Sequence, residues 1–290
     1  MLKVWLMAAR PKTLWVSVAP VVIGTAIAYA DKKVCWEMAL ACLLFSLLIQ
    51  VGTNFTNDCY DFKKGADTPN RLGPIRVMQA KLLNVRVMQR AIVFIFFLAF
   101  VVGIFLFWRA GWPLALICFF SIVSGFFYTA GPYPLGYYGF GDLFAFLFFG
   151  PIAVGATYYV QALSIHSYVL VSGIAPGLLS TAILSINNLR DVKEDSLTGK
   201  KTLAVYFGKT FVKAEFIFCF VVACLIPLVL FITERGHVYS LATVFVLPLA
   251  FPVIKVVCLQ EDGALLNEAL ARAGKLLFVY ALVFSFGWLL

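Results

Sequence analysis

The stretch NFTNDCYDFKKGAD, residues 54–67, follows a long apolar run and contains three aspartates. In an α-helix, residues three or four positions apart lie on the same face, so Asn54, Asp58 and Asp61 are predicted to share one face. Another acid, Asp67, follows six residues after Asp61. The stretch therefore places several carboxylates close together at the end of an apolar helix.

A second stretch, NNLRDVKEDSLTGKKTLAV at 187–205, repeats this arrangement after another apolar run. Asn187 and Asp191 are four positions apart, and so are Asp191 and Asp195. Only 14 of the 290 residues are Asp or Glu. Two Asn-x-x-x-Asp patterns, each with another Asp one turn on, are unusual in so acid-poor a chain, and we interpret them as a pair.

Carboxylates on one helical face repel each other and require a positive partner. Mg²⁺ prefers hard oxygen ligands and bridges to substrate phosphates, so two facing clusters would suit a diphosphate. The alternative for either cluster alone is a solvated helix end at a membrane surface. The predicted metal ligands are Asn54, Asp58, Asp61, Asp67, Asn187, Asp191 and Asp195, and the predicted catalytic residues among them are Asp58, Asp61, Asp191 and Asp195.

The composition is that of a polytopic membrane protein. Of the 290 residues, 62% are apolar and 13% are charged, whereas soluble domains carry about 25% charged residues. The first apolar segment leads into further spans and is interpreted as a span, not as a cleavable signal. The seven cysteines are scattered without a CxxC pair, so free thiols are predicted. In this setting the net charge of +9 does not indicate a nucleic-acid partner.

Nine apolar segments are predicted to cross the bilayer as helices, each needing about 20 apolar residues. They run near 13–30, 36–56, 91–107, 112–129, 141–161, 168–188, 214–232, 239–257 and 275–290. The two acidic clusters begin 133 residues apart, at Asn54 and Asn187, and each ends a span that points the same way. The expected fold is therefore all-α, with two parallel four-helix halves and a ninth helix. An inverted repeat would place the clusters on opposite faces.

Lysine and arginine are distributed unevenly between the two sides of this topology. Nineteen of the 23 lie on the side of the amino terminus, and the other four are Lys32, Lys33, Arg109 and Arg235. Cytoplasmic loops carry an excess of these residues. The amino terminus and both acidic clusters are therefore predicted to face the cytoplasm.

Basic residues follow both clusters and are predicted to contact diphosphate oxygens that Mg²⁺ leaves uncovered. The alternative, for the later residues of the basic segment 66–90, is contact with anionic lipid headgroups. The predicted diphosphate-binding residues are Asn54, Lys63, Lys64, Arg71, Arg76, Asn187, Lys200 and Lys201.

The loop FYTAGPYPLGYYGFGDLFAF, residues 127–146, is predicted to lie on the same face and to wall a pocket for an aromatic acceptor. Its tyrosines are alternatively belt aromatics at the membrane surface, and Asp142 is its one acid. Arg10 or Lys12, at the start of the first span, is predicted to bind an anionic acceptor. Alternatively, these residues only fix the orientation of that span in the membrane. The predicted acceptor-binding residues are Arg10, Lys12, Tyr128, Tyr133 and Tyr137.

Four motifs carry a family resemblance: RPKTL at 10–14, NxxxDxxD at 54–61 followed by GAD at 65–67, YTAGPYPLGYYGFGD at 128–142, and DVKEDSLTGKKTLAV at 191–205. In their order and type they resemble the UbiA superfamily of intramembrane aromatic prenyltransferases. Within it, GADTPNRLGP and GPYPLGYYGFGDLFAFLFFGPIAVGATYYVQ are most similar to the 1,4-dihydroxy-2-naphthoate polyprenyltransferases of menaquinone synthesis.

The resemblance implies a single domain over residues 1–290, with nine transmembrane helices around a central cavity, in the cytoplasmic membrane. It implies two Asp motifs that bind a polyprenyl diphosphate through Mg²⁺, with Asp61 completing the first motif and Asp67 as an outer ligand. The implied reaction transfers the polyprenyl chain to 1,4-dihydroxy-2-naphthoate, with loss of CO₂ and diphosphate, and gives demethylmenaquinone.

Three other interpretations stay open at this point. A relative with another acceptor, such as 4-hydroxybenzoate, homogentisate or haem, would share the chemistry. A phosphatidyl-transferase would concentrate its acids in one motif. A transporter with buried carboxylates would place its acids near mid-membrane, whereas these lie at predicted span ends.

Overall fold

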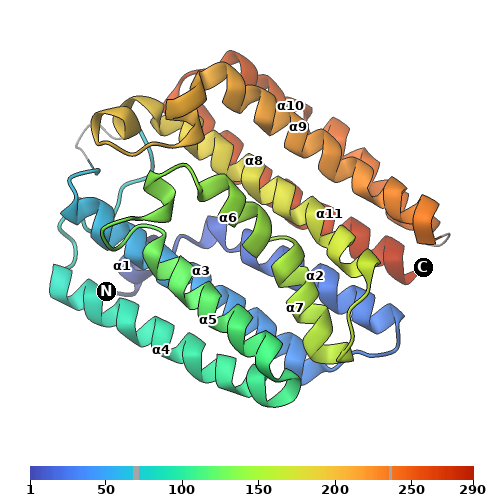
Figure 1. Cartoon of the computed structure of the whole chain (residues 1–290). Coiled ribbons are helices and arrows are strands. Elements are labelled where there is room, and N and C mark those ends of the chain that lie inside the picture. The colour runs from blue at the N-terminus through green and yellow to red at the C-terminus, as the bar shows by residue number, and fades with distance from the viewer. Residues whose placement is uncertain (68–71, 235–236) are drawn as a thin grey trace.

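Helices run the length of the molecule in the computed structural model, which describes residues 1–67, 72–234 and 237–290 (Figure 1). Every regular element in these ranges is helical, so the predicted all-α class is confirmed. The elements are α1 (Leu2–Ala9), η1 (Pro11–Thr13), α2 (Trp15–Ala30), α3 (Trp36–Lys63), α4 (Val85–Ala110), α5 (Trp112–Phe127), η2 (Leu135–Tyr137), α6 (Gly141–Phe148), α7 (Pro151–Ala162), α8 (Ser167–Leu197), α9 (Leu203–Glu234), η3 (Val238–Phe245), α10 (Val246–Leu259) and α11 (Gly263–Leu289).

The described ranges contain seven helical segments that are long and apolar enough to cross a membrane, or eight if the bent pair Leu2–Thr13 and Trp15–Ala30 forms one span. This confirms a multi-span membrane protein. Helix α5, with 16 residues, is apolar but shorter than the others. Each of the nine predicted ranges contains helix, but the count of nine spans stays a prediction.

Glycine and proline break the helices where the chain must bend. Gly150 and Pro151 separate α6 from α7, because proline is accommodated at the first position of a new helix. Gly150 also lies against Gly173 of α8, and a Cβ added to Gly150 would lie 2.7 Å from the Gly173 carbonyl oxygen. Small residues let two helix backbones approach this closely in a membrane protein. Gly208, at φ 80°, bends α9 near its start.

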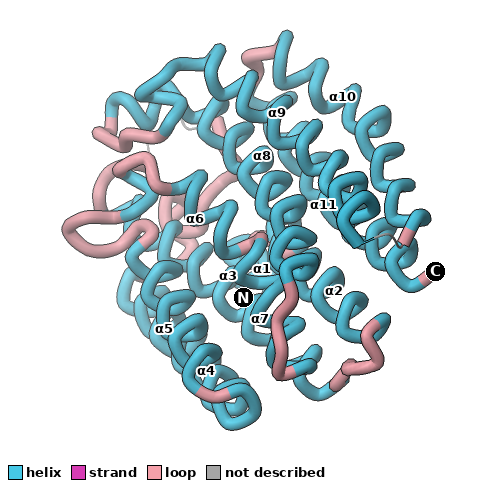
Figure 2. The backbone as a smooth tube through the Cα atoms, turned by 45° about the vertical axis from the view of Figure 1, so that its right-hand side comes forward, coloured by secondary structure: helices cyan, strands magenta, loops and turns pink. Residues whose placement is uncertain are grey.

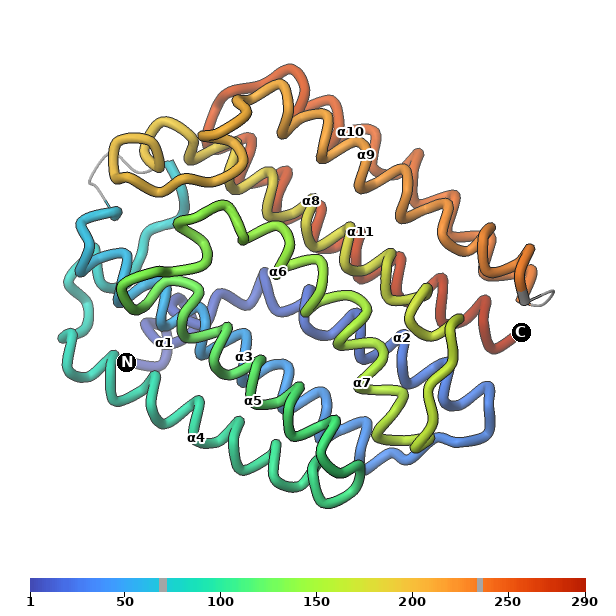
Figure 3. The backbone as a smooth tube through the Cα atoms, in the orientation of Figure 1, coloured from blue at the N-terminus to red at the C-terminus, as the bar shows by residue number. Residues whose placement is uncertain are grey.

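Both acidic clusters lie at the same end of the bundle. Helices α3 and α8 both run toward the left-hand end of the molecule, where the segment 72–84 and the loops 128–140 and 198–202 gather (Figures 1 and 3). The backbone N–H of Lys201 donates to the Tyr137 carbonyl oxygen, which joins two of these loops. The clusters therefore have the parallel arrangement that the spacing predicted, not that of an inverted repeat.

A central cavity of about 300 Å³ opens between the helices. Helices α2, α3, α5, α6, α7 and α8 surround it, and the tube view shows them around the middle of the bundle (Figure 2). Polar and charged side chains from the two clusters line one end. The deeper wall is apolar, with Phe45, Leu106 and Leu114 all buried there. The predicted central cavity is thus present, with a polar end and an apolar interior.

Candidate functional site

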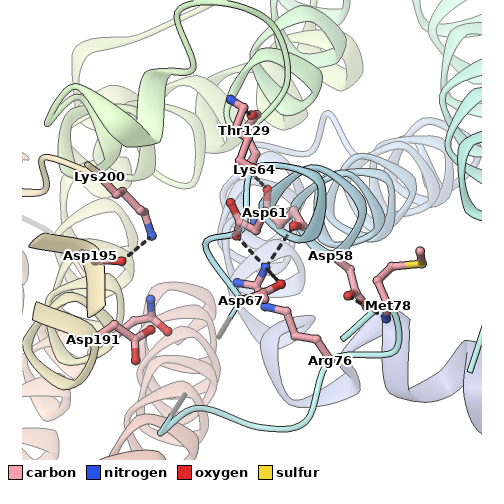
Figure 4. Close-up of polar contacts among 12 residues, drawn as sticks. Asp58, Asp61, Lys64, Asp67, Arg76, Met78, Thr129, Asp191, Asp195 and Lys200 are labelled. Atoms are coloured by element: carbon pink, nitrogen blue, oxygen red, sulfur yellow. Dashed lines mark hydrogen bonds and ion pairs between the residues drawn. The ribbon is translucent and has the colours of Figure 1, made fainter. Parts of the chain in front are cut away.

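Two groups of charged side chains face each other across the polar end of the cavity (Figure 4). We call the group on α3 and the segment after it the α3 cluster: Asn54, Asp58, Asp61, Asp67 and Arg76. We call the group on α8 and the loop after it the α8 cluster: Asn187, Arg190, Asp191, Asp195 and Lys200.

Arg76 is the centre of the α3 cluster. Its Nη1 lies 2.5 Å from Asp61 Oδ2 and 3.1 Å from Asp67 Oδ2, and it also donates to the Asn57 carbonyl oxygen at 2.9 Å. Burial alone would lower the pKa of Arg76, but the charges of Asp61 and Asp67 outweigh it and raise that pKa above its ordinary value. Asp61 lines the cavity, whereas Asp67 contacts Arg76 without appearing on the cavity wall. One guanidinium thus joins Asp61 and Asp67, two of the three acids of the α3 cluster.

The Asp58 side chain is hydrogen-bonded to the backbone of the segment after α3. Its two carboxylate oxygens accept hydrogen bonds from the N–H groups of Val77, at 3.1 Å, and Met78, at 3.2 Å. The residue is 1% exposed and is not on the cavity wall. Asp58 therefore ties α3 to the turn that follows Arg76. Its predicted role as a metal ligand stays a prediction.

Asn54 links the α3 cluster to the amino-terminal bend. Its Nδ2 donates to the Ala9 carbonyl oxygen at 3.0 Å and to Thr13 Oγ1 at 3.2 Å. This contact sets Arg10, between those two residues, on the cavity wall. Lys12 is exposed and is not on the wall. Of the two predicted acceptor cations, Arg10 is therefore the one that reaches the cavity.

In the α8 cluster, Arg190 binds Asp191 through two parallel hydrogen bonds of 2.7 and 2.6 Å. Its remaining donors reach Asn187 Oδ1 at 2.6 Å and Asn267 Oδ1, on α11, at 2.5 Å. Both Arg190 and Asp191 are buried, so this bidentate pair is shielded from water. It holds the end of α8 against α11, and Asn187 remains on the cavity wall.

Asp195 and Lys200 form the looser part of the α8 cluster. Lys200 Nζ lies 3.4 Å from Asp195 Oδ1. The other carboxylate oxygen, Oδ2, is buried and has no hydrogen-bond partner among the described residues. Lys200 lines the cavity. This corner of the site therefore presents a cation to the cavity beside an unsatisfied carboxylate oxygen.

Tyr137 bridges the two clusters from the loop before α6. Its hydroxyl donates to Asp61 Oδ1 at 2.8 Å, and its ring lies 4.6 Å from Lys64 Nζ and 6.0 Å from Lys200 Nζ. Burial, and then the charge of Asp61, raise the pKa of Tyr137, so its phenol stays neutral. Burial lowers the pKa of Lys64, which Asp61 opposes. Lys64 also donates to the Thr129 carbonyl oxygen at 2.8 Å.

Other predicted residues lie away from the cavity. Lys63 stands over the Tyr60 ring at 5.2 Å, Lys201 is exposed, and Tyr133 is 75% exposed against Tyr138. Tyr128, in contrast, lines the cavity as predicted. Arg71 lies outside the described residues.

The structure adds polar wall residues that the sequence reasoning did not assign. Asn57 follows Asn54 by three positions and precedes Asp61 by four, so the helical register contained the signal for it. Asn188 and Thr202 also line the cavity. No local pattern pointed to Asn267, which meets Arg190 from 77 residues away.

The donor atoms of the two clusters are of the type that binds Mg²⁺. In the part of the chain that the structure describes, no group of three or more His, Cys, Asp or Glu side chains is already gathered as a metal site. The donors are nevertheless hard oxygens, the ligands that Mg²⁺ prefers, and Asp195 Oδ2 is a buried acceptor without a hydrogen-bond partner among the described residues. The residues thus fit a cation that uses few protein ligands, and Arg76, Arg190 and Lys200 form ion pairs with the carboxylates.

Known proteins that resemble the chain in sequence and in fold identify its family. The chain is 34% identical to the 1,4-dihydroxy-2-naphthoate octaprenyltransferase of Haemophilus influenzae, over 100% of this chain and 96% of that protein. It is 36% identical to the protein of the same name from Mycobacterium tuberculosis, over 96% of this chain and 94% of that protein. A UbiA homolog from Archaeoglobus fulgidus bound to DMAPP and Mg²⁺ has the same fold, with a TM-score of 0.70 at 14% identity, over 97% of this chain and 99% of that one. The sequence profile of the UbiA prenyltransferase family matches residues 17–289, and the chain belongs to that family.

Proposed function

We propose that this protein transfers a polyprenyl chain from polyprenyl diphosphate to 1,4-dihydroxy-2-naphthoate, with loss of CO₂ and diphosphate, and so forms demethylmenaquinone. The observation that carries the proposal is the full-length match, at 34–36% identity, to relatives named for this acceptor. A cavity that joins a cationic polar end to an apolar interior supports it, because the donor substrate combines a diphosphate with a long hydrocarbon chain.

The diphosphate is placed between the two clusters. Arg76 and Lys200 line this end of the cavity, and Lys64 stands beside them over Tyr137. Preorganised cations in a water-poor site stabilise the negative charge that develops as the C–O bond of the prenyl diphosphate opens. Mg²⁺, held by the predicted ligands Asn54, Asp58, Asp61, Asp67, Asn187, Asp191 and Asp195, would supply further positive charge to the diphosphate oxygens.

The prenyl chain and the acceptor occupy the rest of the cavity. The apolar wall around Phe45, Leu106 and Leu114 receives the hydrocarbon chain. The naphthoate carries a carboxylate that would be repelled by the acidic clusters, so it needs a cation of its own. Arg10 lies on the cavity wall and is proposed to hold it, with Tyr128 beside the ring.

The protein is proposed to act as a single domain of the cytoplasmic membrane, with its amino terminus and both clusters on the cytoplasmic side. The uneven distribution of lysine and arginine supports this orientation. In a cysteine-free protein, Lys64→Cys and Lys201→Cys should react with an impermeant thiol reagent only from the cytoplasm, and Lys33→Cys only from outside. All three positions are exposed. Labelling of positions 64 and 201 from opposite sides would contradict the parallel halves.

Product analysis tests the proposed reaction. Purified protein in lipid is supplied with a polyprenyl diphosphate and, in parallel, with 1,4-dihydroxy-2-naphthoate, 4-hydroxybenzoate or homogentisate. Mass spectrometry should find a prenylated, decarboxylated product from the naphthoate and little product from the other two. Preferential prenylation of another acceptor would overturn the assignment while leaving the prenyltransferase chemistry intact.

A further inference from the structure

Two carboxylates lie on the cavity wall within the described ranges, and they differ in their partners. Asp61 is held by Arg76 and by the Tyr137 hydroxyl. Asp142, in the first turn of α6, is 5% exposed, and its Oδ1 has no hydrogen-bond partner in the described part of the chain. An unsatisfied buried oxygen destabilises the fold, so such a group on a cavity wall points to a ligand that completes its hydrogen bonding.

The backbone around Asp142 is fixed by two contacts. Thr181 Oγ1, on α8, donates to the Asp142 carbonyl oxygen at 3.3 Å. Gly141 leaves room for the Tyr128 hydroxyl, because a Cβ added at Gly141 would lie 2.8 Å from that oxygen. Asp142 and Tyr128 are therefore held next to each other on the wall where the acceptor is proposed to bind.

The titratable groups near Asp142 are poorly suited to accept a proton from a bound ligand. Burial raises the pKa of Tyr128, and the charges of Asp142, Asp61 and Asp195 raise it further, so Tyr128 stays a neutral phenol. The other titratable groups that act on Asp142, or on which it acts, are Lys200 in the loop after α8, and Glu215 and Cys219 on α9. Of the three, only Lys200 lines the cavity, and it is engaged with Asp195. Asp142 is the wall carboxylate that remains available to a ligand.

We propose that Asp142 is the base that accepts the proton of the acceptor's phenolic hydroxyl. The inference rests on the proposed function, because it requires a hydroxylated aromatic acceptor in the cavity. A phenolic hydroxyl ionises near pH 10 in water, so a bound acceptor is largely protonated at neutral pH. A positioned carboxylate removes that proton as the ring becomes nucleophilic.

The step balances without a further reactant. The O–H bond breaks and its proton passes to Asp142, and the freed electron pair moves through the ring into a new bond between the carboxylate-bearing ring carbon and C1 of the prenyl chain. The C–O bond to the diphosphate breaks, and the diphosphate leaves with that electron pair. The ring now carries a keto group beside the carboxylate. CO₂ leaves, its bonding pair restores the aromatic ring and the oxyanion, and Asp142 returns the proton to that oxygen.

Asp142→Asn tests the proposal, because it preserves shape and removes the base. At pH 7 we expect kcat to fall about 100-fold, within the range that general-base catalysis contributes. The KM values for both substrates should stay within about threefold of wild type. As pH is raised, kcat should recover toward the wild-type value, because the acceptor then ionises without help. Asp142→Glu should recover part of the activity at pH 7.

Glu215→Gln is the matched control. Glu215 is another carboxylate with a buried oxygen that lacks a partner among the described residues, but it is not on the cavity wall. Its change should leave kcat within about twofold at every pH. The comparison uses whichever phenolic acceptor the wild-type protein prenylates, so a failure of the naphthoate assignment is seen separately.

Three results would overturn the role of Asp142. One is a kcat for Asp142→Asn close to wild type at pH 7. Another is a loss of the same size at every pH, which indicates a structural defect. The third is a selective rise in the KM for the prenyl diphosphate, which would place Asp142 with Lys200 at the diphosphate.

Discussion

The carboxylate of Asp58 accepts a 3.2 Å hydrogen bond from the backbone N–H of Met78, 20 residues further along the chain. The neighbouring N–H of Val77 donates to the same carboxylate. The residue before this turn is Arg76, whose guanidinium joins Asp61 and Asp67. Asp58 therefore fixes the position of Arg76, a cation that faces the cavity.

Asp58→Asn should raise the KM for the prenyl diphosphate. Hydrogen bonds to a charged group contribute about 1.5–3 kcal/mol, which corresponds to about ten- to hundredfold in binding. Asp31→Asn is the control, because Asp31 also accepts two hydrogen bonds, from Tyr158 and Tyr168, but at the opposite end of the bundle. In steady-state kinetics, the kcat of Asp31→Asn and its KM for the prenyl diphosphate should match those of the wild type. An unchanged KM for the prenyl diphosphate in Asp58→Asn would contradict a role of Asp58 in the diphosphate site, both as the anchor of the turn after Arg76 and as a proposed metal ligand.

Arg10→Ala should weaken binding of the acceptor far more than binding of the prenyl diphosphate. Arg10 is on the cavity wall beside the Asn54 contact, and the loss of a charge-assisted contact costs about 1.5–3 kcal/mol. The KM for the naphthoate should therefore rise about ten- to hundredfold. Lys12→Ala, two residues away and exposed, should change neither KM. A selective effect of Arg10→Ala on the prenyl diphosphate would move Arg10 to the diphosphate site.

Ala156→Phe should shorten the prenyl chain that the enzyme accepts. Ala156 is half-buried on α7 and lines the apolar part of the cavity, so a phenyl ring there fills space needed by a long chain. Turnover of a ten-carbon prenyl diphosphate should be kept, while turnover of a forty-carbon one falls at least tenfold. Leu116→Phe, at a 55% exposed position on α5, should change neither rate. Equal rates for both lengths in Ala156→Phe would show that the tail leaves the cavity by another route.

Helical periodicity predicted part of the site from local spacing. Asn54, Asp61 and Asn187 lie on the cavity wall because spacings of three and four residues set the face of a helix, whatever the tertiary structure. The same rule placed Asp58 on that face, but the turn after Arg76 packs against it and takes its hydrogen bonds. A contact between residues so far apart in sequence leaves no periodic signal.

Long-range contacts explain the other differences. Arg190 is absent from the predicted site residues, but Asn267 of α11 accepts one of its hydrogen bonds and holds it in the α8 cluster. The predicted span 141–161 is one candidate span, Gly141–Ala162, in which Gly150 and Pro151 interrupt the helix between α6 and α7. Asp142, in the first of these helices, lies on the cavity wall with Tyr128. Hydropathy detects an apolar run of this length, but it does not detect a break in the helix within it.

The two clusters are proposed to act together on a Mg²⁺-bound prenyl diphosphate in order to prenylate the naphthoate. The most direct measurement is the rate of demethylmenaquinone formation by purified protein, first depleted of metal with EDTA and then titrated with Mg²⁺, for the wild type and for Asp195→Asn. We expect no product in EDTA, saturable recovery with Mg²⁺, and a much higher Mg²⁺ requirement, or no recovery, for Asp195→Asn. Wild-type turnover that is unchanged in EDTA, or an Asp195→Asn titration that matches wild type, would contradict the account.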